Sequence, residues 1–362
     1  MPGRDITRRL NKAASLLFLL ALVTPSVGTA APPCPVEQSS TASAANPQQT
    51  QSQPPKTQET PAQKPPDQNS SDQNSDNGVY VFHQKVDEVM LHATVVDDHQ
   101  HIVTNLERSA FSVIEEGKPQ SIISFHHVDI PVAMGIVIDN SGSMKEKRNK
   151  VNQAALNLVR SSNPRDEVFV VNFNDEQYLD QDFTNDLLKL KDALEKIDTH
   201  GGTALYDAVV ASADHLRQYG RLEKKVIFVV TDGEDNASSE TLEQAVRNLQ
   251  MENGPAVYAI GILGDEEHPK RARKALQTIA DRTGGIAFFP KTLDEVDAIS
   301  RTIANDIRNQ YAIGYKPSTP KGAGGFRQVT VIAKAKAKGH GKLTVRTKSG
   351  YYAGAQPSSS SK

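Results

Sequence analysis

The chain has 362 residues and a formal net charge of −2 at pH 7, which gives no electrostatic basis for binding nucleic acid or an anionic membrane surface. It holds a single cysteine, Cys34, which excludes an internal disulfide. Hydrophobic residues make up 37% of the chain, less than is usual in globular proteins. We therefore expect part of the chain to lie outside any packed core.

Residues 1–30 have the pattern of a signal peptide. Basic residues precede an apolar stretch at residues 13–23, and the small residues Gly28, Thr29 and Ala30 follow it. The apolar stretch is too short to cross a hydrocarbon core of about 30 Å comfortably. We expect cleavage after Ala30 and no stable membrane span thereafter, which places the protein in the periplasm, the cell envelope or the medium. Free, surface-attached and exported forms all remain open.

Residues 31–78 predict a disordered linker. They are rich in Pro, Gln, Ser, Thr, Asn and Asp and include no aromatic residue. Such a segment cannot bury enough apolar surface to offset the entropy lost on ordering. The serine-rich residues 355–362 predict a disordered tail by the same argument.

Two segments of alternating apolar and polar residues predict β structure. Residues 79–129 form an N-terminal β module with expected strands near residues 89–96, 111–114 and 122–125. Residues 311–354 return to strands, expected at 311–315, 329–333 and 343–346. We expect these C-terminal strands to pack with the N-terminal β module, so that the intervening segment is an insertion.

Residues 130–310 alternate short, almost wholly apolar strands with helices. Strands covered on both faces and separated by helices are typical of a parallel α/β sheet. The fold class predicted is therefore α/β, with a Rossmann-like, doubly wound, mostly parallel sheet. The expected strands are residues 132–138, 168–173, 226–230, 257–262 and 286–289. The expected helices are residues 145–159, a helix to 197 capped by Thr184 or Asn185, 204–216, a helix to 249 opened by residues 238–242, and 293–307.

Oxygen-bearing side chains follow two of these strands and one turn. Asp139, Ser141 and Ser143 come directly after the first strand, and Asp232 follows the strand at residues 226–230. Thr203 lies in a glycine-containing turn that leads into a helix. Ligands of open parallel sheets bind at the carboxyl ends of the strands. Two carboxylates and three hydroxyls suit a hard divalent cation such as Mg²⁺, so these five residues predict a metal site.

The order and spacing of Asp139-x-Ser141-x-Ser143, Thr203 and Asp232 resemble the metal-ion-dependent adhesion site (MIDAS) of von Willebrand factor type A (VWA) domains. The flanking strands, including residues 111–120 and 350–352, are similar to those of bacterial secreted "VWFA-related" proteins. The resemblance implies a bound Mg²⁺, with Mn²⁺ or Ca²⁺ as alternatives. It also implies binding of a protein partner through an Asp or Glu side chain.

Two other classes of function remain open. A DxD-type phosphatase needs a carboxylate where Ser141 stands, and the chain has no Gly-x-Ser-x-Gly elbow, Walker loop or Gly-x-Gly-x-x-Gly. Glu234 is the only obvious base for a metal-dependent hydrolase, so we expect no enzyme and no catalytic residue. A structural envelope or secretion-assembly component, with a mainly structural metal, is the other alternative. A metal requirement for partner binding distinguishes these classes.

Further acidic residues lie near the five. Asp235 and Asn236 extend the loop after Asp232, and we expect a solvated loop there rather than a second Ca²⁺ site, because EF-hand spacing is absent. Tyr206 and Asp207 follow Thr203, and they either support the site or pack the helix N-terminus. The histidine-rich turn at residues 97–101 is interpreted as a hairpin turn rather than a zinc site.

Overall fold

The computed structural model describes residues 88–127, 129–195, 199–264, 269–320, 322, 324–334 and 341–354, all within the compact unit Val79–Lys362. The predicted signal peptide, linker and tail, together with Cys34, lie outside the described residues. Within the described part, no helix combines the length and the apolar character that a membrane crossing requires.

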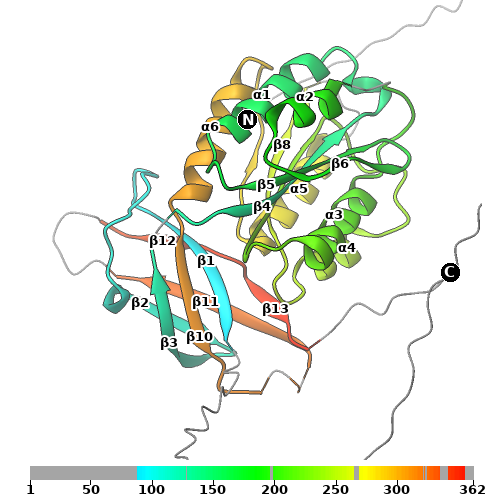
Figure 1. The fold of residues 1–362 in the computed structure, drawn as a ribbon. Coiled ribbons are helices and arrows are strands. Elements are labelled where there is room, and N and C mark those ends of the chain that lie inside the picture. The colour runs from blue at the N-terminus through cyan, green and yellow to red at the C-terminus, as the bar shows by residue number, and fades with distance from the viewer. Residues whose placement is uncertain are drawn as a thin grey trace, which may run out of the picture. The chain divides into compact units, whose positions relative to one another are not determined.

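A six-stranded sheet forms the centre of the α/β domain (Figure 1). Its strands, in spatial order, are β6 Gln177–Thr184, β5 Glu167–Phe173, β4 Val132–Asp139, β7 Lys224–Thr231, β8 Ala256–Gly261 and β9 Ala287–Phe288. All run parallel except β6, which pairs antiparallel with β5 at one edge. Every residue of β4 is buried, as expected for a strand that helices cover on both faces. The predicted mostly parallel α/β fold is confirmed.

Three helices cover each face of this sheet. Helices α1 Arg148–Arg160, α2 Leu187–Glu195 and α6 Glu295–Arg308 pack on one face. Helices α3 Leu205–Tyr219, α4 Leu242–Leu249 and α5 Pro269–Thr283 pack on the other. Alternate residues of β4 enter the two cores, Ile136 the first and Val137 the second. The close-packed strand therefore holds its carboxyl end in a fixed position between two helical layers.

Several helix starts differ from the sequence prediction. Helix α2 begins at Leu187 because the Asp186 carboxylate accepts a hydrogen bond from the Leu188 backbone N–H, so the predicted cap at Thr184 or Asn185 is wrong. Helix α1 begins at Arg148 rather than at residue 145, since residues 142–144 form a 3₁₀ turn.

A seven-stranded sheet forms the β module. Its spatial order is β12-β1-β10-β3-β2-β11-β13. The strands are β1 Val89–Val96, β2 Phe111–Glu115, β3 Lys118–His126, β10 Tyr311–Lys316, β11 Phe326–Ala333, β12 Thr344–Arg346 and β13 Gly350–Tyr352. Strand β10 lies between β1 and β3, so strands from both ends of the chain interleave. This confirms the predicted module of flanking strands, while the limits at residues 79, 129, 311 and 354 stay predictions.

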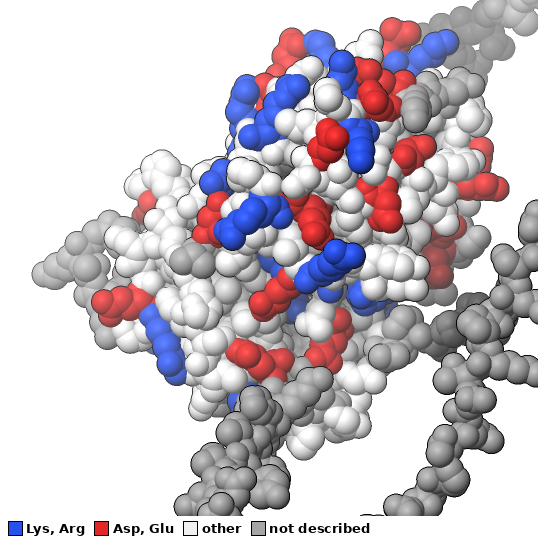
Figure 2. Space-filling model, in the orientation of Figure 1, with Lys and Arg blue, Asp and Glu red and all other residues white. Residues whose placement is uncertain are grey.

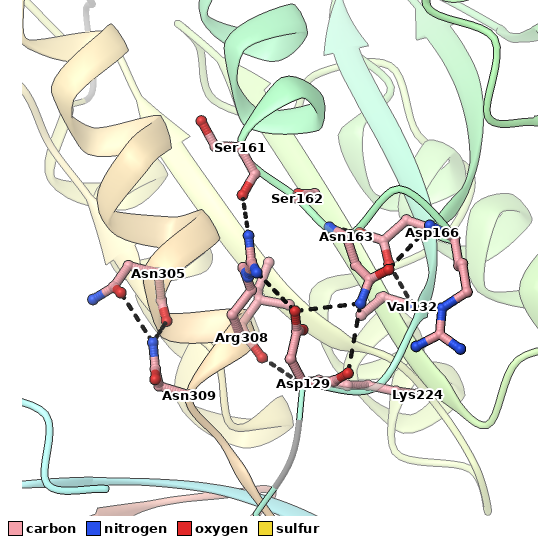
Figure 3. Close-up of polar contacts among 12 residues, drawn as sticks. Asp129, Val132, Ser161, Ser162, Asn163, Asp166, Lys224, Asn305, Arg308 and Asn309 are labelled. Atoms are coloured by element: carbon pink, nitrogen blue, oxygen red, sulfur yellow. Dashed lines mark hydrogen bonds and ion pairs between the residues drawn. The ribbon is translucent and has the colours of Figure 1, made fainter.

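Polar contacts join the two segments that connect the β module to the α/β domain (Figure 3). The Arg308 guanidinium at the end of α6 lies 2.8 Å from an Asp129 carboxylate oxygen, just before β4. Asn163 also donates to Asp129, at 3.3 Å. The Asp166 carboxylate accepts from the Val132 backbone N–H at 2.8 Å, which fixes the start of β4. These contacts lie at the amino end of β4, the opposite end from Asp139.

A buried polar cluster joins α6 to the β module. The Asp306 side chain is fully paired: it accepts from the Thr94 hydroxyl at 3.1 Å and the Tyr258 hydroxyl at 2.6 Å, and it forms an ion pair with Arg346. Gln310 donates to the Tyr258 hydroxyl at 3.1 Å. Because a buried carboxylate is tolerated only when it is paired, this cluster fixes the contact between α6 and the module.

Candidate metal centre

Three loops meet at the carboxyl ends of β4 and β7. The Gly142 N–H donates to the Gly201 carbonyl at 3.4 Å, which joins the loop after β4 to the turn before α3. The Thr203 N–H donates to the Asn236 side-chain oxygen at 2.8 Å, and the Asn236 N–H returns to the Thr203 carbonyl at 3.0 Å. These bonds tie the turn before α3 to the loop after β7. All three predicted segments therefore share one end of the sheet.

Asp139 is the last residue of β4 and has no exposed surface. One carboxylate oxygen accepts from the Ser141 backbone N–H at 2.7 Å, and the other accepts from the Thr231 hydroxyl at 2.6 Å. Burial raises the pKa of Asp139 to about 6, although the hydrogen bonds from Ser141 and Thr231 oppose the shift, and the charge of Asp232 adds to it. A cation nearby would favour the charged form of this carboxyl.

Hydroxyl groups link the loop after β4 to Asp232. The Ser141 and Ser143 hydroxyl oxygens lie 3.2 Å apart, and the Ser143 hydroxyl donates to an Asp232 carboxylate oxygen at 2.8 Å. Ser141 and Asp232 are buried, whereas Ser143 is exposed. Thr203 is 4% exposed, and its turn is bonded to the loops after β4 and β7 through Gly201 and Asn236. The structure thus brings Ser141, Ser143 and Asp232 into direct contact, with Asp139 bonded to Ser141 and Thr203 on the adjoining turn.

Lys147 also contacts this group of residues, although the sequence did not predict it. Its ammonium nitrogen lies 2.5 Å from the second Asp232 carboxylate oxygen. The Lys147 side chain is 18% exposed, while the Asp232 side chain beneath it is fully buried. The two residues stand 85 positions apart, and no spacing rule in a single sequence marks such a pair.

Arg148 lies beneath the site, and the sequence did not predict this position either. Its guanidinium donates to the Asp139 carbonyl at 3.2 Å and to the Asn172 side-chain oxygen at 3.1 Å. Burial lowers the pKa of Arg148 to about 10, while the charges of Asp139 and Asp180 oppose that shift. Arg148 therefore places a buried positive charge next to Asp139 and fixes the backbone at the end of β4. Lys147 and Arg148 are neighbours in the sequence, and nothing in the sequence indicates that the Arg148 side chain is the more buried of the two.

The loop after β7 is built onto the first turn of α3. Asp207 accepts from the Ser239 and Glu240 backbone N–H groups, both at 2.9 Å. Asp235 accepts from the Tyr206 N–H at 2.9 Å and from the Ser238 hydroxyl at 2.5 Å, and its pKa is raised by burial. Asp235 is thus half-buried and hydrogen-bonded, whereas Asn236 is exposed, so the expected solvated loop is found only in part. Asp207 orders the loop that carries Asp232 and Asn236.

Residues 134–302 match the family model of the von Willebrand factor type A domain. The α/β domain is a VWA domain. Domains of this family commonly bind a divalent metal and are generally interaction modules rather than enzymes. No curated protein matches the chain.

Solved structures also resemble the chain. A von Willebrand factor type A protein from Catenulispora acidiphila is 15% identical, with 75% of this chain and 74% of that chain covered and a TM-score of 0.44. The PilB minor pilin from Streptococcus sanguinis is 14% identical, with coverage of 50% and 62% and a TM-score of 0.42. The vWF domain of the type V pili tip protein Mfa5 from Porphyromonas gingivalis is 14% identical, with coverage of 50% and 97% and a TM-score of 0.41. The chain thus spans less than two thirds of the pilin, and identities this low transfer no role to it.

The donor groups of this VWA domain fit a hard divalent cation. Among the described residues, no group of three or more His, Cys, Asp or Glu is arranged to hold a metal, so a site here has to include hydroxyl oxygens. The contact chain of Ser141, Ser143 and Asp232 supplies such oxygens. The ammonium of Lys147 on Asp232 shows that the position accommodates a positive charge. Mg²⁺ prefers about six oxygen ligands, so five protein residues leave a position for water or for a group of a partner.

Proposed function

We propose that the VWA domain binds Mg²⁺, or Mn²⁺ or Ca²⁺ in its place, and through it captures an acidic side chain of a protein partner. The main support for this proposal is the series of contacts from the Ser141 hydroxyl to the Ser143 hydroxyl and on to the Asp232 carboxylate, at the carboxyl ends of β4 and β7. The residues that would hold the ion are Asp139, Ser141, Ser143, Thr203 and Asp232.

The balance of charges explains why an acidic partner fits. The five residues include two carboxylates, and neutral hydroxyls supply the other oxygens. Hydroxyls donate electron pairs without cancelling the charge of the ion, so two carboxylates at most balance it and the ion stays electrophilic. An Asp or Glu side chain of a partner is the protein group that suits an open position on such an ion.

The proposed setting is extracytoplasmic, and the proposed partner is a protein rather than nucleic acid. The signal-like pattern of residues 1–30 supports the first point. Acidic and basic side chains are intermingled over the face seen in Figure 2, without the basic stripe that nucleic-acid binding requires.

We propose no catalytic residue. Glu234, the one candidate base, lies 3.8 Å from the Arg271 guanidinium. A general base has to reach the proton that it removes within hydrogen-bonding distance. An ion-paired carboxylate on the rim supports a binding role for the site better than a hydrolytic one.

Isothermal titration with MgCl₂ and MnCl₂ tests the metal site. We expect the wild-type protein to bind one ion and Asp139→Asn and Asp232→Asn to lose at least about 100-fold in affinity, since each removes a charged donor. Asp294→Asn is the matched control, because Asp294 is an exposed carboxylate of the same domain that contacts only Lys150 among the pairs described. Unchanged affinity in both site variants contradicts the proposal.

Capture from an envelope extract tests the partner. Immobilised wild-type protein is compared in Mg²⁺, in EDTA and as Asp139→Asn, and retained proteins are identified after cross-linking. We expect a partner that is retained only by the wild type in Mg²⁺ and lost when its contacting Asp or Glu is changed to Asn or Gln. Retention of the same partner under all three conditions would point to the β module and to a structural role.

A further inference from the structure

The two oxygens of the Asp232 carboxylate have different partners. One accepts from the Ser143 hydroxyl at 2.8 Å, and the other accepts from the Lys147 ammonium at 2.5 Å. The carboxylate has no exposed surface, whereas the Lys147 side chain retains 18% exposure. Lys147 therefore stands between Asp232 and solvent and covers the carboxylate from outside.

Hydrogen bonds at both ends fix the backbone of Lys147, whereas its side chain is held by its contact with Asp232. The Lys147 N–H donates to the Met144 carbonyl at 2.8 Å, and its own carbonyl accepts from the Val151 N–H at 3.2 Å, at the start of α1. A lysine carries its charge on a flexible four-carbon stem. The ammonium can thus leave Asp232 by rotation of the side chain, without any change in the loop that carries Ser141 and Ser143.

We propose that Lys147 is an internal cation that neutralises Asp232 when the site holds no metal, and that a divalent ion has to displace it. This inference rests on the metal binding proposed above. A divalent ion and an ammonium that contact the same buried carboxylate repel each other at short range. Binding of the ion therefore favours departure of the Lys147 ammonium from Asp232. The ion binds more weakly because it has to displace Lys147. Without the ion, the buried charge of Asp232 is still paired with the Lys147 ammonium.

The displaced Lys147 ammonium also contributes to partner binding. Once it leaves Asp232, it stands at the solvent side of the site, on the turn that leads into α1. A carboxylate that approaches the site there meets a second positive charge besides the ion. Lys147 thereby favours an acidic group of the partner over a neutral one.

Three variants test the displacement. Lys147→Met removes the charge and keeps most of the apolar stem, and Lys147→Arg keeps the charge. Lys145→Met is the matched control, because Lys145 is an exposed lysine of the same segment. By isothermal titration with MnCl₂ we expect Lys147→Met to bind about 10-fold more tightly than the wild type, Lys147→Arg to stay close to it and Lys145→Met to change less than about twofold.

Thermal unfolding gives a second readout. In EDTA we expect Lys147→Met to melt below the wild type, because the buried Asp232 carboxylate then keeps the Ser143 hydroxyl but has no opposite charge beside it. Added Mn²⁺ should raise its melting temperature more than that of the wild type, since tighter binding stabilises the folded state further. If Lys147→Met does not fold, Lys147→Gln takes its place, because the Gln amide can still donate to Asp232.

Lysine labelling of the wild-type protein tests the movement directly. With an acetylating reagent and peptide mass spectrometry, we expect Lys147 to be protected in EDTA and several-fold more reactive in Mn²⁺, while Lys145 reacts equally in both. In Asp139→Asn the metal should not change the reactivity of Lys147.

The outcomes separate this inference from the proposed function. Metal binding by the wild type with equal affinity in Lys147→Met, or equal labelling of Lys147 with and without Mn²⁺, overturns the inference and leaves the proposed function standing. Absence of metal binding in the wild type and in every variant overturns both.

Discussion

At the scale of single residues, the site depends on charges that are buried and paired. Asp139 is fully buried, and burial raises its pKa to about 6. Arg148 lies behind it with a guanidinium that donates to the Asp139 carbonyl and to Asn172. Lys147 covers Asp232 from the solvent side. The two adjacent basic residues thus have different roles: Arg148 fixes the end of β4, and Lys147 covers the Asp232 carboxylate.

Replacement of Arg148 tests the first of these tasks. We expect Arg148→Met to lower the free energy of unfolding by roughly 3 kcal/mol, because the Asn172 oxygen and the Asp139 carbonyl lose a buried donor. Arg148→Lys should recover only part of the loss, since an ammonium cannot reproduce the forked donors of a guanidinium. Urea denaturation measures both values. A loss below about 0.5 kcal/mol in Arg148→Met, the size typical of surface substitutions, would show that Arg148 does not fix the strand end.

At the scale of elements, the sequence pattern predicted the apolar strands well and the polar strands poorly. Strand β4 is apolar at nearly every position, so its pattern alone indicates burial on both faces. Strand β6 is largely exposed and carries Asp180 and Asp182, and no apolar alternation marks it. Helix α5 was not predicted because half of its buried residues are alanine, with only Leu276 and Ile279 as larger apolar residues.

The same contrast holds within the candidate metal centre. Asp139 and Asp232 could be predicted because each ends an apolar strand, and the carboxyl ends of parallel strands share one edge of a sheet. The contacts made by Lys147 and Arg148 could not be predicted, since they depend on tertiary distances between residues far apart in the chain. The role of Asp207 was left open for the same reason, because only the fold shows which loop it contacts.

The contact between α3 and the loop after β7 gives a prediction at this scale. Asp207→Ala removes the acceptor for the Ser239 and Glu240 N–H groups and should cost about 1–2 kcal/mol of stability. We expect faster amide hydrogen exchange at residues 238–240 and weaker Mn²⁺ binding, by about threefold, because the same loop carries Asp232. Exchange measured by mass spectrometry checks the first effect. Protection of residues 238–240 equal to that of the wild type would contradict it.

At the scale of the whole described unit, the VWA domain is inserted between β3 and β10 of the β module. Strands from both ends of the chain close the module, and the Asp306 cluster joins it to α6. The amino end of the VWA sheet faces this junction, whereas the carboxyl end holds the candidate metal centre. The proposed binding site and the attachment to the module therefore occupy opposite ends of β4.

The Asp306 cluster should contribute strongly to stability. We expect Asp306→Ala to lower the free energy of unfolding by about 3–5 kcal/mol, because Arg346 and two hydroxyls lose a shared buried partner. Asn305→Ala is the control, since Asn305 is exposed on the same helix. Denaturant titration compares the two variants. Equal stability of both would show that the junction does not depend on Asp306.

Lys224 is buried and donates to the Ile307 carbonyl of α6, so it lies at the same junction and should give it a dependence on pH. Burial lowers the pKa of Lys224 from 10.5 to about 8. Between pH 8 and 10 the unfolded chain binds more protons at this residue than the folded chain does, so the free energy of unfolding rises with pH. The rise is at most about 1.4 kcal/mol per pH unit. We expect urea denaturation of the wild type to show this slope and Lys224→Met to lack it; equal slopes in the two proteins would exclude Lys224 as the cause.

Diffraction from crystals soaked in MnCl₂ is the sharpest test of whether the five residues bind a divalent ion. We expect one anomalous difference peak for manganese at the carboxyl ends of β4 and β7, within coordinating distance of oxygens from the group Asp139, Ser141, Ser143, Thr203 and Asp232. We also expect the peak to be absent from crystals of Asp139→Asn. A manganese peak elsewhere, with none at this end of the sheet in the wild type, would show that these residues do not form the metal site.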